Sequence, residues 1–143
     1  MIRQEIYNQI AAALAHLADY EGNEIIQHLD FWNQNVMYAE QEEPWGRPAV
    51  FVEIGEIHYS PTCEGGVYRT QNIEVRLHIV LDYHDCESYT NAFLLTEAIA
   101  RVVTKAEPTT TTAFKLVASY TSHNHEELLE MIEVFTVRAT RHL

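Results

Sequence analysis

The chain has 143 residues, of which 47% are hydrophobic and 21% charged, and it carries a formal net charge of −12. This length and composition predict one soluble globular domain over residues 1–143, with enough apolar residues for a core of its own. The strong negative charge opposes the phosphate backbone of nucleic acids, which excludes a direct nucleic-acid grip as the expected function.

The targeting and redox signals of the sequence are few. The opening residues MIRQEIYNQI hold no apolar segment of a signal peptide, and no apolar run approaches the roughly 18 residues of a membrane span. Cys63 and Cys86 are too few for a disulfide framework and fit a reducing compartment. We therefore expect no membrane partner and a cytosolic location.

The N-terminal segment has the period of an amphipathic helix over residues 2–18. Its apolar residues recur at steps of three and four: Ile2, Ile6, Ile10, Ala13, Leu14 and Leu17. This spacing places them on one helix face, and Gly22 with Asn23 provides a stop. Residues 24–43 lack a clean period. Ile25, Ile26 and Leu29 would suit a second short helix, and the remainder, which ends in an acidic run and Pro44, predicts an irregular arm.

The middle of the chain predicts a long hairpin. Residues 49–58 alternate between two faces and form the first strand, and residues 68–82 form the second, with an apolar residue at every second position from Ile73 to Leu81. The connection contains Pro61 and a Gly-Gly pair, which is typical of a turn. We expect an antiparallel hairpin whose tip projects from the domain.

The C-terminal part predicts a helix and a second hairpin. A capping signal at Asp85 or Ser88 precedes an amphipathic stretch that runs to about Lys105. Residues 114–120 then alternate as a strand, and a polar turn leads to a last strand from Leu128 onward. This last strand is apolar on both faces near its middle, so we place it inside the sheet.

The element order is therefore helix, hairpin, helix, hairpin. It predicts an α+β, two-layer domain with a four-stranded, mainly antiparallel sheet, two helices on one face in αββ–αββ order and a projecting β-hairpin. The opposite face is expected to be partly apolar, because it includes Val80, Val117, Ile132 and Val134. An apolar face on a monomer predicts a partner, most simply another copy of the chain.

Two short passages contain residue types that bind metals. His84 and Asp85 lie within DYHDC, and His123 and His125 form an H-x-H whose rings would lie on one side of an extended segment. Five consecutive residues rarely supply a whole site, however, and a strand end with a helix cap and a solvated turn explain both passages. We expect no metal and no cofactor. A metal-dependent enzyme or sensor that uses these four residues is the alternative.

The sequence holds no catalytic signature. There is no G-x-S-x-G elbow, no cysteine beside a base, and no G-K-[ST] after the Gly-Gly pair. Glu53 and Glu74 could be cross-strand neighbours, but Arg76 or Arg47 nearby favours ordinary salt bridges over an acid–base pair. We therefore expect a protein that is not an enzyme.

Aromatic residues provide the candidates for contact with a partner. Trp32 and Trp45 flank the acidic run, and tryptophan is frequent at interface hot spots, although a core position explains both equally well. As anchors they would suit a monomeric protein-binding module, which is a third functional class. The interface candidates of the sequence are Trp32, Trp45, Tyr59, Pro61, Tyr68, Val80 and Val117.

Three passages carry a resemblance to a known family. They are RPAVFVEIG (47–55) after an acidic and aromatic arm, the helix that begins near Asp85 directly after the long strand, and the closing LVASYTSHNHEELLEMIEVFTVRA (116–139). In these passages and in the order of its elements the chain resembles the tail terminator, or tail-completion (neck), proteins of long-tailed phages, as carried by prophages. The resemblance extends over nearly the whole chain and lies in topology and residue pattern.

The resemblance implies a structural protein without catalytic residues. Members of that family cap the tail tube as a ring, commonly of six copies, and present a surface to the head and to other tail or head-connector proteins. It implies assembly in the bacterial cytoplasm and a place in the virion. The negative charge would suit a lumen through which DNA slides. The aromatic arm departs from a minimal terminator, which leaves a head–tail joining role open.

Overall fold

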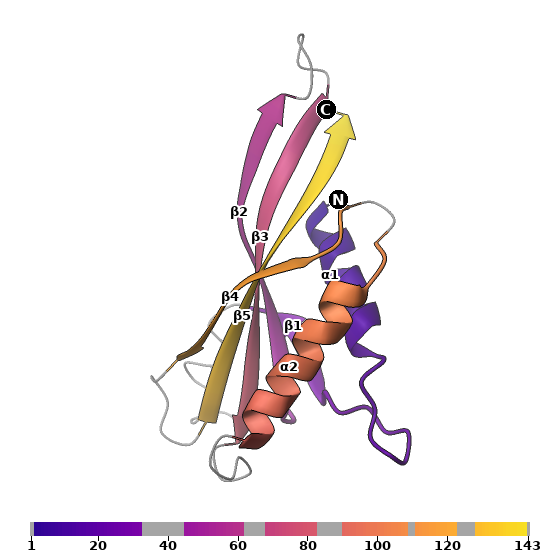
Figure 1. Ribbon diagram of the computed structural model, residues 1–143, viewed down its shortest axis with the longest axis vertical. Coiled ribbons are helices and arrows are strands. Elements are labelled where there is room, and N and C mark those ends of the chain that lie inside the picture. The colour runs from indigo at the N-terminus through magenta and orange to yellow at the C-terminus, as the bar shows by residue number, and fades with distance from the viewer. Residues whose placement is uncertain are drawn as a thin grey trace.

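The computed structural model describes residues 2–32, 45–61, 68–82, 90–108, 111–122 and 128–142. Two helices pack on one face of a single five-stranded sheet, which confirms the two-layer α+β class (Figure 1). The elements are α1 (Ile2–Leu14), β1 (His28–Phe31), β2 (Ala49–Pro61), β3 (Tyr68–Asp82), α2 (Thr90–Lys105), β4 (Lys115–Ser122) and β5 (Leu128–His142). The predicted cap of the second helix, at residues 85–88, lies outside the described residues.

The strand order is β1-β2-β3-β5-β4, and the four strands β2, β3, β5 and β4 are antiparallel to one another in turn. These four form the two predicted hairpins, and β5 lies inside the sheet as expected. The fifth strand is a correction, because the second short helix suggested for Ile25 to Leu29 is not formed. This segment becomes β1, which pairs parallel to β2 from His28 opposite Ala49 to Phe31 opposite Val52. Pairing with the edge of β2 satisfies backbone groups that a helix of this length would leave largely free.

Helix α1 is shorter than predicted because the chain reverses after Leu14. The carboxylate of Asp19 accepts hydrogen bonds from the backbone N–H groups of Glu21 and Asn23, both at 2.9 Å. Gly22 adopts the left-handed conformation, with a φ of 86°, that such a tight turn requires. These backbone hydrogen bonds, that from Asn23 foremost, lower the pKa of Asp19 below its usual value.

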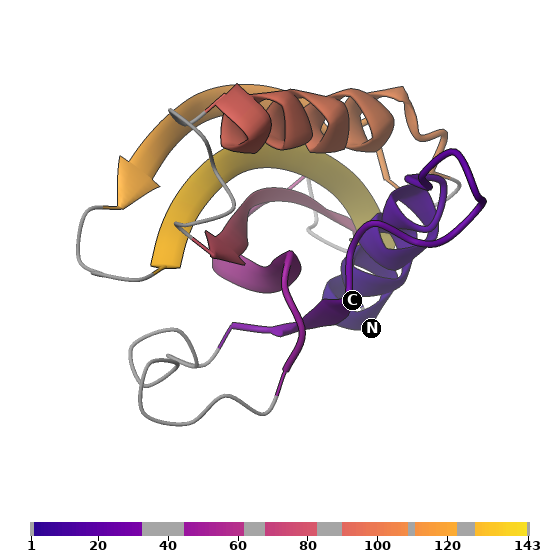
Figure 2. The same cartoon turned by 90° about the horizontal axis from the view of Figure 1, so that it is seen from below.

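The main core lies between the helices and the sheet. Every second residue of β3 from Ile73 to Leu81 faces this core, as the alternation predicts. Ile6 and Ile10 of α1 and Ile99 of α2 are completely buried against them. In the view of Figure 2, α2 lies along the outside of β4 and β5, and α1 lies at the side of the layer.

Strands β2, β3 and β5 extend together beyond the helices, so the projecting element is a three-stranded arm (Figure 1). The β2–β3 register shifts between Ile54 and Ile57, which marks a bulge near the base of the arm. Gly55 lies in this bulge, and a Cβ atom there would stand 3.2 Å from the backbone oxygen of Glu74. The close approach of the two strands therefore favours a residue without a side chain at this position.

Candidate assembly surfaces and a buried polar cluster

The face of the sheet opposite the helices has a small apolar core of its own, formed by Ala49, Phe51, Val80 and Leu128. Trp32 and Trp45 pack against this cluster and are half-buried. The ring of Trp45 meets that of Phe51 edge-on, with centroids 5.1 Å apart. The apolar second face predicted from the sequence therefore exists, but this chain covers one end of it itself. Val80 is completely buried and has no exposed surface for a partner.

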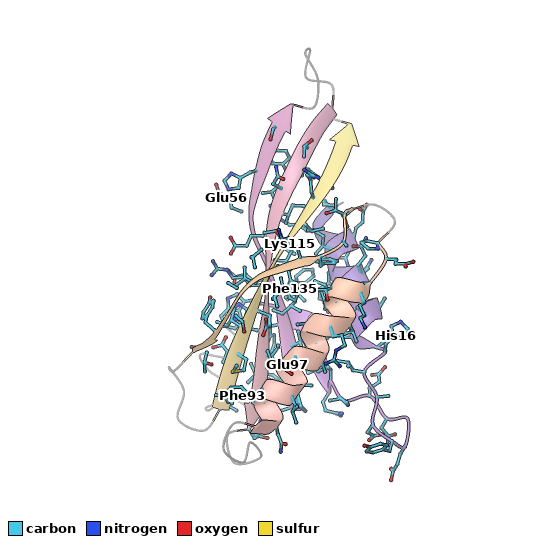
Figure 3. The ribbon with its side chains drawn as sticks, viewed as in Figure 1. His16, Glu56, Phe93, Glu97, Lys115 and Phe135 are labelled. Atoms are coloured by element: carbon cyan, nitrogen blue, oxygen red, sulfur yellow. The ribbon has the colours of Figure 1, made fainter. Side chains whose placement is uncertain are left out.

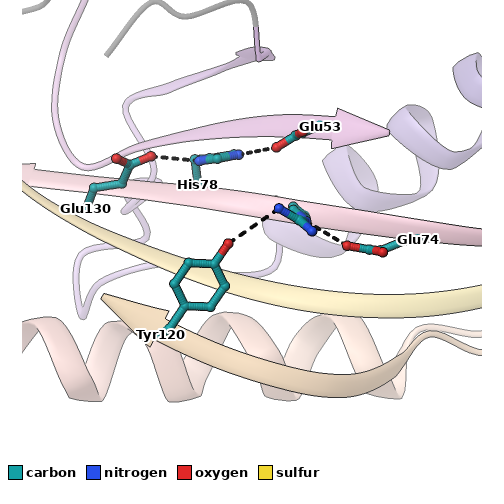
Figure 4. A network of polar contacts seen from close by, with 6 residues as sticks. Glu53, Glu74, His78, Tyr120 and Glu130 are labelled. Atoms are coloured by element: carbon teal, nitrogen blue, oxygen red, sulfur yellow. Dashed lines mark hydrogen bonds and ion pairs between the residues drawn. The ribbon is translucent and has the colours of Figure 1, made fainter. Parts of the chain in front are cut away.

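A polar cluster centred on His78 lies beside these aromatic rings, and Figure 4 shows its contacts with Glu53 and Glu130. His78 Nδ1 is 2.6 Å from Glu130 Oε2, and His78 Nε2 is 2.7 Å from Glu53 Oε1. The indole of Trp32 stacks on the imidazole with 3.9 Å between the ring centroids and 3° between the planes. Each ring nitrogen of His78 thus lies at hydrogen-bond distance from one carboxyl oxygen, and a ring nitrogen that carries a proton donates to the oxygen that it faces.

A second ion pair lies on the same face, closer to the arm. Arg76 Nε donates to Glu74 Oε1 at 2.6 Å, and Arg76 Nη1 is 3.5 Å from the hydroxyl of Tyr120. The hydrogen bond to Glu74 raises the pKa of the Arg76 guanidinium above its usual value. Glu74 thus forms the salt bridge with Arg76 that the sequence suggests, whereas Glu53 contacts His78 and Arg47 pairs with Asp82. Glu53 and Glu74 do not form a carboxylate pair.

Glu133 is a buried carboxyl group on the face that carries the helices, with 3% of its surface exposed. The Ser119 hydroxyl donates to Glu133 Oε1 at 2.8 Å, whereas Glu133 Oε2 has no hydrogen-bond partner among the described residues. Burial raises the pKa of Glu133 above its ordinary value, because a carboxylate loses its hydration there. Glu133 lies among apolar core residues, and this environment favours the neutral form of its carboxyl group.

The metal candidates His84, Asp85, His123 and His125 lie outside the described residues, as do both cysteines. Within the described ranges, no group of three or more His, Cys, Asp or Glu side chains could hold a metal ion. In the His78 cluster each ring nitrogen already contacts a carboxylate oxygen. The hypothesis of a metal site therefore depends only on His84, Asp85, His123 and His125.

The largest exposed apolar groups of the sheet lie on β2 and β4, which stand on opposite sides of the central strands. Tyr59 on β2 is 54% exposed, and Val117 on β4 is 51% exposed. All residues from Lys115 to Tyr120 are exposed, although the strand beside them is mostly buried. Tyr59 and Val117 are thus accessible, as an interface requires. The side chains of Pro61 and Tyr68 lie outside the described residues.

Helix α2 adds apolar surface near its N-terminal end. Phe93 is 49% exposed and Leu94 60% exposed (Figure 3). A groove of about 430 Å³ runs beside Leu94 and is lined by Leu95 and Leu81, among others. The ion pair between Arg47 and Asp82 borders this groove. Its apolar lining is typical of a surface that packs against protein.

The sequence interpretation did not find the His78 cluster, because alternation placed His78 on the solvent face of its strand. One signal was present. His78 lies between Leu77 and Ile79, two residues before Val80, and such an apolar stretch indicates a strand buried on both faces. The carboxylates that contact His78 come from β2 and β5, and only the sheet register brings them together.

The comparisons with known proteins give a likeness in fold. No protein-family model matches the chain, and none of the curated proteins matches it either. Neither helix in the described part of the chain is long and apolar enough to cross a membrane. Among solved structures, the chain is similar to a chain in the virion of a native gene transfer agent (GTA) particle. The TM-score is 0.54 and the identity 10%, and the match covers 95% of this chain and 92% of that chain. The two chains share a fold over nearly their whole lengths.

Proposed function

We propose that the chain is a structural protein of a phage-like particle, encoded by a prophage, and that it acts as a tail terminator or head–tail joining (neck) protein. The observation that carries this proposal is the likeness in fold to a chain of a gene transfer agent virion over 95% of the chain. In this role the protein needs shape and contact surfaces, and no catalytic residue.

The distribution of exposed apolar groups supports assembly as a ring. Tyr59 and Val117 lie toward opposite edges of the sheet, so a contact between copies would join two different surfaces of the chain. Contacts of this head-to-tail kind close into rings when the rotation between copies divides a full turn. Other tail or head-connector proteins would then bind the two ends of the ring.

The net charge of −12 supports a position around DNA. A ring of such chains would line its lumen with negative potential, which keeps the phosphate backbone from adhering while DNA passes. The protein would assemble in the bacterial cytoplasm and remain in the virion.

Sedimentation velocity and negative-stain electron microscopy of the purified protein test the ring. The protein concentration should be about ten to a hundred times a dissociation constant in the micromolar range. We expect a single large species and ring-shaped particles. A monomer as the sole species at these concentrations would contradict the proposal.

Deletion of the gene separates the two roles. Loss of a terminator leaves the length of the tails uncontrolled, whereas loss of a neck protein leaves tails of normal length that do not join heads. Electron microscopy of the induced particles measures both outcomes. Normal, complete particles would show that the chain has neither role.

A further inference from the structure

Strand β4 is an open edge of the sheet. In the part of the chain that the structure describes, β5 is the only strand paired with β4, so the backbone groups on the outer side of β4 face solvent. Its residues from Lys115 to Tyr120 are exposed on both faces. An exposed edge of this kind is a template for pairing with another strand.

The edge at the other end of the sheet is closed. The outward carbonyl of Leu29 in β1 accepts a hydrogen bond from the Tyr7 hydroxyl at 3.2 Å. The N–H of Phe31 donates to its neighbour, Asp30 Oδ1, at 2.8 Å. β1 is also only 4 residues long. A second copy therefore finds few backbone groups to bind on β1.

β2 is an edge strand over most of its length. β1 pairs with β2 only from Ala49 to Val52, and no other described strand but β3 pairs with β2 beyond that point. The stretch from Glu53 to Pro61 therefore forms a second open edge, on the opposite side of the sheet from β4. The pairing pattern also makes β2 and β4 run in opposite directions.

The two open edges are complementary in chemistry. Lys115 is the only charged residue of β4, and the free stretch of β2 carries Glu56, whose side chain is 76% exposed (Figure 3). The exposed apolar residues are Tyr59 on the free stretch of β2 and Leu116, Val117 and Tyr120 on β4. Edges of opposite charge attract each other, and an antiparallel register that places Val117 opposite Tyr59 forms a favourable pair of an aromatic and a β-branched residue.

We propose that β4 of one copy pairs antiparallel with residues 53–61 of β2 in the next copy, so that one sheet continues around the ring. This inference rests on the ring of the proposed function and names its contact. Ser122 of β4 pairs with Glu130 of β5, and Glu130 pairs with Val80 of β3. Val80 pairs with Ala49, so β4 lies level with the part of β2 that β1 partly covers. Successive copies are therefore offset along the strands, as a closed sheet requires.

Cross-linking with single cysteines tests the contact. In a background with Cys63→Ser and Cys86→Ser, the variants are Val117→Cys, Tyr59→Cys and the double variant with both changes. A short, flexible bis-maleimide reagent tolerates the unknown register. We expect a ladder of covalent multimers from the double variant, and no multimers from either single variant. Val117→Cys with Glu97→Cys, on the exposed side of α2, is the control and gives no ladder.

A charge swap tests the same contact without cysteines. Lys115→Glu and Glu56→Lys each give these two positions charges of the same sign and weaken assembly by less than about tenfold in sedimentation, because the two residues are not directly opposite when Val117 faces Tyr59. The double swap restores the opposite signs of the two edges and returns assembly toward that of the unchanged protein.

The outcomes separate the two proposals. If the unchanged protein forms rings but the double cysteine variant gives no ladder, the β4–β2 contact is wrong and the proposed function stands. A covalent dimer of Val117→Cys alone would show two-fold pairing of β4 with itself and would also overturn the contact. If the unchanged protein stays monomeric, the ring of the proposed function fails first.

Discussion

His78 shows how a single residue can alter the character of a sheet face. Its position in an alternating strand predicts a solvated side chain, yet it is 5% exposed. Trp32 covers the imidazole ring, and carboxyl groups from two other strands each contact one of the ring nitrogens. A histidine that bridges two carboxylates ties β2, β3 and β5 together beneath an aromatic lid.

The His78→Leu substitution is expected to destabilise the fold by about 3 kcal/mol, because it removes the imidazole that contacts the buried Glu130 carboxyl group. Urea unfolding followed by tryptophan fluorescence measures the change. In the matched variant His78→Leu/Glu130→Gln the loss should be smaller, since no buried carboxylate remains there. Equal losses in both variants would show that packing under Trp32 determines the effect.

The buried Glu133 predicts a stability that depends on pH. Its pKa is raised in the folded state, so the folded protein binds this proton more tightly than the unfolded chain does. The contribution of this group to stability therefore falls as the pH rises from the unfolded pKa through the folded pKa. Glu133→Gln mimics the neutral acid, and it should stabilise the protein near pH 7 but change little below about pH 4.

Unfolding free energies of Glu133→Gln at both pH values measure this effect. Ser119→Ala is the control, because it removes the hydrogen bond to Glu133 and leaves the carboxyl group in place. A gain in stability of equal size at both pH values would contradict the assignment to ionisation.

The elements that the sequence predicts well are those with long periodic patterns. The bounds of β3 are those expected from the alternation of residues 68–82, and the two helices follow their apolar stripes. β1 was missed because it is 4 residues long and pairs in parallel with a strand far along the chain. The His78 cluster was missed for a related reason, since its carboxylates meet only through the register of three strands.

The bulge at the base of the arm makes a prediction for Gly55. A Cβ atom at this position would stand 3.2 Å from the Glu74 backbone oxygen, which is too close without a shift of the strands. We expect Gly55→Ala to destabilise the protein by about 1 kcal/mol and Gly55→Val by more, as overpacking generally does. The urea midpoints of both variants measure the effect.

Gly22→Ser in the turn after α1 is the comparison variant that separates the effect of crowding from that of backbone conformation. Nothing lies within 4 Å of a Cβ atom at Gly22, but its φ of 86° disfavours a side chain. If Gly55→Ala and Gly55→Val were both as stable as the unchanged protein, the close approach of β2 and β3 would not constrain this position.

The net charge of the whole molecule opposes the proposed assembly. Each copy carries −12, so copies in the proposed ring would repel one another, and strand pairing and apolar contacts would have to outweigh this repulsion. We expect assembly to strengthen as salt rises from about 0.05 M to about 0.5 M, because the Debye length then falls from roughly 14 Å to 4 Å. Sedimentation across this range measures the association, with sodium chloride and potassium glutamate compared to exclude a specific anion effect. Weaker assembly at high salt would show that ion pairs between copies dominate.

The place where β1 leaves the sheet has a consequence for evolution as well as for assembly. The backbone N–H of Trp32 donates to the Val52 oxygen, and the side chain then folds onto His78. The proposed contact between copies therefore depends on the short length of β1. A relative that kept the same fold but continued β1 along β2 by a few residues would cover the free edge of β2, and β4 of a second copy could no longer pair there.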